Sequence, residues 1–188
     1  TAFVAVENEH TAVELLARAR RVTDDRVITF EYMPRDAIAF ALKHIEGTRD
    51  PMRAAYSHYV LMELAAGESA AADLRKMLEE LLSNGMEDGI VLDAVFAESG
   101  QQVSDFWKIR ESIPEAQKYE GASSKHDISV PVSRVADFLV EAISDLEEMI
   151  PGIRPCAFGH VGDGNIHSNL SRPVDMSDDN FRLLESEI

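Results

Sequence analysis

The stretch HDISVPV, residues 126–132, decides between the two common classes of mixed α and β fold. In it the polar Asp127 and Ser129 alternate with the apolar Ile128 and Val130. Successive side chains of a strand point to opposite faces, so this alternation is typical of a strand with one face covered and the other open. Strands of a parallel, doubly wound sheet are buried on both faces and are apolar throughout. The stretch therefore favours an α+β fold with a mostly antiparallel sheet, covered by helices on one side.

Further strands and helices are indicated around this stretch by their apolar periodicity. Short runs rich in β-branched and aromatic residues predict six or seven strands, of which residues 126–132 are one. The other runs lie at residues 2–6, 26–33, 58–64, 89–97 and 155–161. Apolar residues at three and four spacing predict helices at residues 9–21, 34–44, 69–85, 102–119, 133–152 and 181–188. The repeated order of strand and helix suggests duplicated units.

Composition and charge narrow the class of protein. The 188 residues are 45% hydrophobic, which is enough for one globular domain with a sizeable core. There are 34 acidic and 18 basic residues, and a net charge of -16 repels phosphate backbones, so nucleic acid is not expected as a partner. The single cysteine, Cys156, excludes an internal disulfide and makes a cytoplasmic location the default. Because the chain opens at Thr1 inside a predicted strand and stops inside a predicted helix, we expect a piece of a larger polypeptide.

A glycine-rich loop lies near the end of the chain, in FGHVGDGNIHSNL, residues 158–170. Gly162 and Gly164, with Asp163 and Asn165 beside them, are turn formers. The stretch therefore predicts a strand, a tight turn and a second strand.

Three polar side chains fall on one face of this predicted hairpin. His160 ends the incoming strand, while His167 and Asn169 are two residues apart on the outgoing strand and share a face. Neutral histidine nitrogen is a common ligand for zinc, manganese or iron, so the two imidazoles suit a divalent metal, although a catalytic site needs a third protein ligand. A structural zinc site that includes Cys156, a phosphate cradle, and a hairpin with merely exposed histidines are the alternatives.

Two cations are candidates for binding an anion. Arg110 lies four residues after Phe106 and three before Ile113, at the edge of an apolar helical stripe, where a cation is costly unless it meets an anion. Lys125 opens the strand that carries Asp127. A snorkelling arginine and a solvated lysine are the alternative interpretations.

Two long stretches then carry a resemblance to a known family. GHVGDGNIH, residues 159–167, and FWKIRESIPEAQKYEGASSKHDISVPVSRV, residues 106–135, resemble the C-terminal domain of FAD-linked oxidoreductases of the D-lactate dehydrogenase, glycolate oxidase and D-2-hydroxyglutarate dehydrogenase type. The resemblance covers nearly the whole chain. It implies a substrate domain of duplicated ferredoxin-like units beside a separate FAD-binding domain that would precede Thr1.

The resemblance also implies roles for single residues. In the D-2-hydroxyglutarate branch, the positions of His160 and His167 hold a divalent metal, zinc or manganese. A glutamate from a later motif, beyond residue 188, completes that site, and the same motif supplies the catalytic base, so no catalytic residue is expected in this fragment. The positions of Arg110, Lys125 and Asn169 contact the substrate. A threonine of the family pattern is replaced here by proline, at position 114.

The sequence therefore predicts that residues 1–188 form the substrate- and metal-binding domain of a flavin-dependent dehydrogenase. The enzyme would oxidise a D-2-hydroxyacid, such as D-2-hydroxyglutarate or D-lactate, to the 2-oxoacid, and this domain alone is expected to be inactive. The expected partners are that small acid, the FAD-binding domain, an unidentified electron acceptor and further copies in a homo-oligomer. Through its electron acceptor, the enzyme would be peripheral to a membrane. A ferredoxin-like regulatory module that binds a small acid without catalysis, and a structural zinc domain, remain the alternatives.

Overall fold

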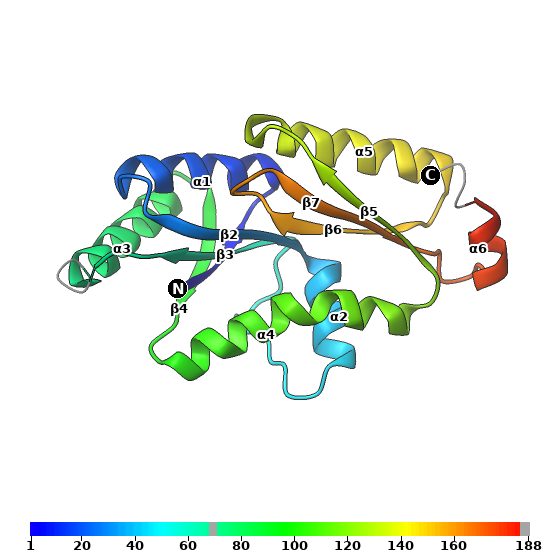
Figure 1. Cartoon of the computed structure of the whole chain (residues 1–188), viewed down its shortest axis with the longest axis horizontal. Helices are drawn as coiled ribbons and strands as arrows, with labels where there is room; N and C mark the ends of the chain where they lie inside the picture. The colour runs from blue at the N-terminus through cyan, green and yellow to red at the C-terminus, as the bar shows by residue number, and fades with distance from the viewer. Residues whose placement is uncertain (68–70, 185–188) are drawn as a thin grey trace.

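One seven-stranded antiparallel sheet runs through the domain (Figure 1), and the computed structural model describes residues 1–67 and 71–184. The strands lie in the order β4-β1-β3-β2-β6-β7-β5. Their bounds are β1 Ala2–Val6, β2 Val27–Pro34, β3 His58–Leu64, β4 Val91–Phe96, β5 Ser123–Ser129, β6 Arg154–His160 and β7 Asn165–Ser171. The predicted α+β class and antiparallel sheet are confirmed.

Helices connect these strands close to the predicted places. Their bounds are α1 Glu9–Val22, α2 Arg35–His44, α3 Ala71–Glu87, α4 Gly100–Ala116, α5 Val135–Met149 and α6 Asp178–Leu184, with 3-10 turns η2 at Gln117–Glu120 and η3 at Val132–Arg134. The predicted start of a helix at Ser69, and the end of the last helix at residues 185–188, lie outside the described residues. In the part of the chain that the structure covers, no helix is long and apolar enough to cross a membrane.

Strand β5 ends earlier than the sequence predicted. It stops at Ser129, and the following chain turns into η3 after Pro131. Proline has no N–H to donate to a sheet and disfavours continued strand pairing. The alternation that favoured the α+β class is confirmed within β5, where Lys125, Asp127 and Ser129 are exposed.

The duplication is visible in the order of the strands. Strands β4-β1-β3-β2 with α1 and α3 form one ferredoxin-like unit, and β6-β7-β5 with α5 repeat three of its four strands in the same relative order. The two units join through the antiparallel pair of β2 and β6, where Glu31 lies opposite His160 and Tyr32 opposite Gly159. The helices α2 and α4 are additions to this repeat.

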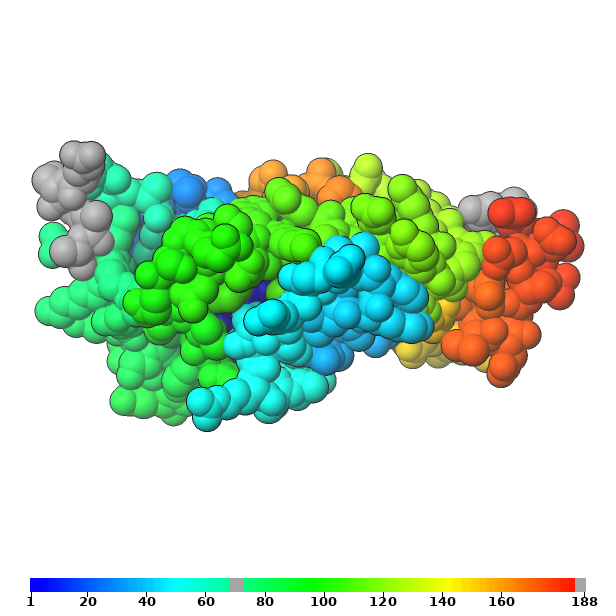
Figure 2. All heavy atoms as spheres, turned by 90° about the horizontal axis from the view of Figure 1, so that it is seen from below, coloured from blue at the N-terminus to red at the C-terminus, as the bar shows by residue number. Residues whose placement is uncertain are grey.

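Helices cover both faces of the sheet, not one as the sequence predicted. Figure 1 shows α1, α3 and α5 above the sheet and α2 and α4 below it, and Figure 2 shows the side chains of α2 and α4 spread over the lower face. Each layer has its own apolar core. The prediction of helices on one side came from the pattern of β5, which is an edge strand. In contrast, all five residues of β1 are buried, so this strand is covered on both faces.

Candidate functional site

The predicted hairpin is formed by β6 and β7 with a turn at residues 161–164. Gly164 has a φ of 80°, and a Cβ added there would lie 2.0 Å from the carbonyl oxygen of Val130. Gly159 has a φ of 155°, and an added Cβ would lie 2.5 Å from the carbonyl oxygen of Asn165. Glycine at these two positions therefore lets the hairpin close tightly on itself and on the chain after β5.

His160 and His167 lie on the same face of the sheet, below which α2 and α4 pack, and their ring centroids are 6.4 Å apart. The side chain of His160 is half exposed, and His167 packs its ring against Phe158. Asn169 follows on the same face, 5% exposed. The three residues therefore share one face as the sequence predicted, in a row in which His167 lies between His160 and Asn169.

A carboxylate lies against Nδ1 of each histidine. Asp127 Oδ1 is 2.5 Å from Nδ1 of His167, and Glu31 Oε1 contacts Nδ1 of His160. A carboxylate that accepts from Nδ1–H keeps the proton on that nitrogen and leaves the lone pair of Nε2 free. Metal-ligating histidines almost always donate their other ring N–H to a carboxylate, a backbone carbonyl or a water molecule. The contact of His167 with Asp127 has hydrogen-bond geometry, whereas Oε1 of Glu31 lies against His160 without forming a hydrogen bond.

Glu31 is the residue that the sequence analysis missed. Its side chain is fully buried, and Oε2 accepts a hydrogen bond of 2.6 Å from Nε of Arg110. The available signal was an acidic residue inside the apolar run RVITFEYM, on a strand whose Phe30 and Tyr32 are buried on the other face. Its partners could not be identified from the sequence, because Arg110 lies 79 residues away in the chain.

Arg110 is buried, so the interpretation as a snorkelling arginine is wrong. Its guanidinium carbon lies 4.8 Å from the ring centroid of Phe158, while Nε is engaged by Glu31. No hydrogen bond from within the described residues engages its terminal nitrogens. Glu31 and Phe158 thus hold one edge and one face of the guanidinium.

Lys125 and Asn169 lie opposite each other on β5 and β7. Lys125 is exposed and has no ion pair with any residue that the structure describes. Asn169 donates a hydrogen bond of 2.8 Å from Nδ2 to Oε1 of Gln117 in η2. Gln117 is fully buried, and within the described residues its Nε2 has no partner. Gln117 is therefore a second polar residue that the sequence analysis did not single out.

A cavity of about 310 Å³ lies beside His160. Its lining includes Glu31, Trp107 and Arg20, and Arg20 donates a hydrogen bond of 2.6 Å to the carbonyl oxygen of Gly162 in the turn. Of the candidate residues from the sequence, only His160 lines this cavity; His167, Arg110, Lys125 and Asn169 do not.

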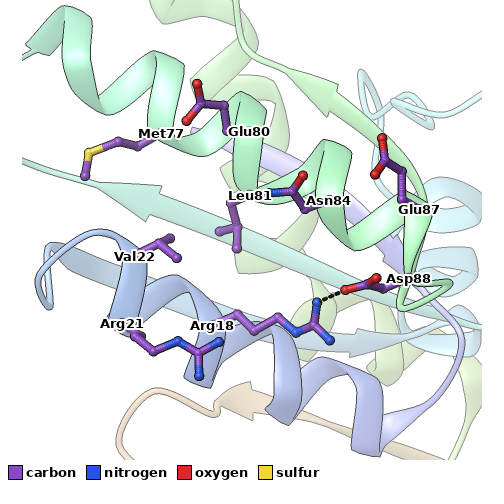
Figure 3. A pocket seen from close by; sticks show the side chains of 9 residues that line it. All are labelled: Arg18, Arg21, Val22, Met77, Glu80, Leu81, Asn84, Glu87 and Asp88. Carbon is purple, nitrogen blue, oxygen red and sulfur yellow. Dashed lines mark hydrogen bonds and ion pairs between the residues drawn. The ribbon is translucent and has the colours of Figure 1, made fainter.

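A different cavity, of about 430 Å³, lies between α1 and α3 (Figure 3). One ion pair crosses it: Arg18 contacts Asp88, and Arg18 also contacts Glu14 on its own helix. It lies on the opposite face of the sheet from the histidines. We assign it no function.

The metal ligands available among the described residues are incomplete. No group of three or more histidine, cysteine, aspartate and glutamate side chains in residues 1–67 and 71–184 is arranged to hold a metal ion. Cys156 is fully buried, and burial raises the pKa of its thiol. It lies four residues before His160 on β6, about 13 Å along a strand, so the alternative of a structural zinc site with this cysteine is wrong. Among the described residues, His160 and His167 thus have no third side chain placed to complete a metal site.

Comparisons with known proteins match nearly the whole chain. A family model described as FAD linked oxidases, C-terminal domain, matches residues 1–184. A probable mitochondrial D-2-hydroxyglutarate dehydrogenase of Oryza sativa subsp. indica is 38% identical over 170 residues, which are 90% of this chain and 30% of that protein. The mitochondrial D-2-hydroxyglutarate dehydrogenase of Arabidopsis thaliana is 33% identical over 170 residues, with the same coverage. The chain thus spans about 30% of the length of these relatives.

A solved structure shares the fold. An alkyldihydroxyacetonephosphate synthase matches with a TM-score of 0.61 and 12% sequence identity, over 100% of this chain and 38% of that one. At this identity the match supports the architecture alone.

Proposed function

Since this chain belongs to the family of C-terminal domains of FAD-linked oxidases, we propose that it is the substrate- and metal-binding domain of a flavin-dependent dehydrogenase that oxidises a D-2-hydroxyacid to the 2-oxoacid. The names of the relatives favour D-2-hydroxyglutarate as the acid, with D-lactate as a second option. The observation that carries the metal part of the proposal is the carboxylate against Nδ1 of both His160 and His167.

The two histidines would hold a divalent metal, zinc or manganese, through Nε2. A metal bound there polarises substrate oxygens and lowers the pKa of the substrate hydroxyl. The third ligand and the base that accepts the hydroxyl proton are proposed to come from other parts of the polypeptide, because this chain spans about 30% of its relatives. The FAD-binding domain is assigned to those other parts as well.

The substrate would be bound by Arg110, Lys125 and Asn169. The terminal edge of Arg110 suits a carboxylate, because two parallel N–H groups can donate to its two oxygens. Lys125 adds a second cation on the same face of the sheet, which suits an acid with two carboxylates. By binding both ends of the acid, these residues would orient C2 of the substrate. When bound, FAD supplies the acceptor for the hydride from C2.

The proposal is tested by comparing the full-length wild-type protein with variants in which His160 or His167 is replaced. Wild type is expected to reduce an artificial acceptor with D-2-hydroxyglutarate or D-lactate, to lose activity with a chelator, and to regain it with zinc or manganese. His160→Ala and His167→Ala should lose bound metal and this recovery. The control is His10→Ala, which removes an exposed histidine of α1 and should change neither.

Two results would contradict the proposal. Metal content that is unchanged in both site variants would exclude the histidines as ligands. Binding of a small acid without any turnover would instead support the alternative of a regulatory module. The cytoplasmic location and the homo-oligomer stay predictions; the plant relatives carry the word mitochondrial in their names.

A further inference from the structure

The carboxylate of Glu31 lies at the junction of the two ferredoxin-like units, on the strand that pairs with β6. Its two oxygens face two different partners: Oε2 accepts from Nε of Arg110, and Oε1 contacts Nδ1 of His160. We propose that Glu31 is a positioning residue that orients the metal-binding His160 and the carboxylate-binding Arg110 together. This inference rests on the proposed function and adds to it a residue that links the metal side of the site to the substrate side.

The burial of Glu31 is the first argument. Its side chain has no exposed surface, and a carboxylate taken out of water is destabilising by several kcal/mol unless it is paired and hydrogen-bonded. Replacing such a buried ion pair by apolar residues of similar volume is often neutral or stabilising. Fold stability alone therefore gives little reason to bury Glu31 and Arg110 here, whereas orientation of two binding residues does.

The free oxygen of Glu31 is the second argument. Although Oε1 lies against the imidazole of His160, the contact does not have hydrogen-bond geometry, and no other described residue bonds to this oxygen. Oε1 is thus a buried acceptor aimed at a half-exposed ring. Rotation of the His160 ring would complete the hydrogen bond from Nδ1–H to Oε1 and leave Nε2 free to bind a metal.

The effect on Arg110 is the third argument. A free arginine side chain has many rotamers, but here Nε is bonded to Glu31 and the guanidinium lies over the ring of Phe158. These contacts fix the plane of the guanidinium and leave the NH1 and NH2 edge for a carboxylate. Without Glu31, the guanidinium of Arg110 loses the hydrogen bond that fixes its plane.

The other carboxylate of the site differs in a way that makes the inference testable. Asp127 is 75% exposed, contacts His167 only, and does not contact Arg110. Its loss should affect the metal side of the site alone, whereas loss of Glu31 should affect both sides.

The experiment compares Glu31→Gln with Asp127→Asn in the full-length protein. Zinc affinity is measured by competition with a chelator, and KM is measured with D-2-hydroxyglutarate. Glu31→Gln should lower zinc affinity about 10-fold or more and raise KM by roughly 10-fold. Asp127→Asn should lower zinc affinity to a similar extent. When zinc is present at a saturating concentration, Asp127→Asn should raise KM less than Glu31→Gln does, because Asp127 does not contact Arg110. A matched control is Glu120→Gln, a largely buried and ion-paired carboxylate near the opposite end of β6, which should change neither zinc affinity nor KM.

A second variant covers failure of Glu31→Gln to fold, which an unpaired buried Arg110 would cause. The double variant Glu31→Gln with Arg110→Met removes both buried charges, and it should still show the loss of zinc affinity. Wild-type zinc affinity in the double variant, or in a folded Glu31→Gln, would overturn the inference while leaving the proposed function in place. A wild-type protein that binds no metal and oxidises no D-2-hydroxyacid would contradict the proposed function, and the inference would fail with it.

Discussion

Asn169 donates a hydrogen bond from Nδ2 to Oε1 of Gln117 over 2.8 Å, and both side chains are buried. The bond joins the outgoing strand of the histidine hairpin to the turn that follows α4. Because Gln117 engages the amino end of the Asn169 amide, the carbonyl end is left to accept a hydrogen bond from a ligand. The hydrogen bond to Gln117 thus determines which end of the Asn169 amide faces the ligand side.

Changing Gln117 to leucine should weaken substrate binding. The Asn169 amide would lose its acceptor and would be free to turn, so we expect kcat/KM of the full-length enzyme to fall roughly 5-fold, equivalent to about 1 kcal/mol. The control Gln101→Leu changes an exposed glutamine at the start of α4 and should have no effect. Wild-type kinetics in a folded Gln117→Leu would show that the amide is oriented by other contacts.

The two cations of the site should contribute unequally. Arg110→Ala removes a buried, charge-assisted contact, and we expect a loss of about 2 kcal/mol or more, roughly 30-fold in kcat/KM. Lys125 is exposed and more strongly screened by water, so Lys125→Ala should cost less. Lys76→Ala on α3 serves as the control for loss of an exposed lysine. If all three variants have the same kcat/KM as wild type, Arg110 and Lys125 do not bind the substrate carboxylates.

Gly164→Ala should destabilise the hairpin through a collision with the backbone. An alanine at a φ of 80° costs about 1–2 kcal/mol for the left-handed conformation alone, and its Cβ would also lie 2.0 Å from the carbonyl oxygen of Val130. Gly89 isolates the first effect, because it has a φ of 77° and no atom within 4 Å of an added Cβ. Urea unfolding should show a larger loss for Gly164→Ala than for Gly89→Ala. Equal losses would mean that the contact with residue 130 relaxes without cost.

The acid stability of the fold should depend on one carboxylate away from the site. Glu120 is bound by three side chains: Lys43, His44 and Arg154. Burial alone would raise the pKa of Glu120, but these hydrogen bonds outweigh it and lower the pKa from 4.5 to about 2. Because the pKa is lower in the folded state, ionised Glu120 stabilises the fold above pH 4.5, and this contribution is lost as the pH falls from 4.5 to about 2.

Urea unfolding at pH 6 and pH 3 measures this contribution. Glu120→Gln should be less stable than wild type at pH 6, and the difference should narrow at pH 3. Glu79→Gln, which changes an exposed glutamate paired with Arg75, should follow wild type at both pH values. A constant difference between Glu120→Gln and wild type would show that the pKa of Glu120 is not lowered by folding.

The sequence by itself determined the features that depend on neighbours along the chain. The alternation within residues 126–132 predicted an antiparallel α+β sheet. The turn formers at residues 162 and 164 predicted the hairpin, and the spacing of two between His167 and Asn169 placed these side chains on one face. These features follow from the period of two in a strand and from the backbone freedom of glycine, which are properties of local sequence.

Only the tertiary structure decided which residues surround that face. Glu31 contacts His160 because β2 and β6 lie side by side at the junction of the two units, and it contacts Arg110 because α4 crosses the lower face of the sheet. The same helix gives the sheet a second covered face, which the pattern of the edge strand β5 did not show. No periodicity links residues so far apart in the chain. Their pairing follows from the order of the strands and from the free energy of burying a carboxylate only where a cation meets it.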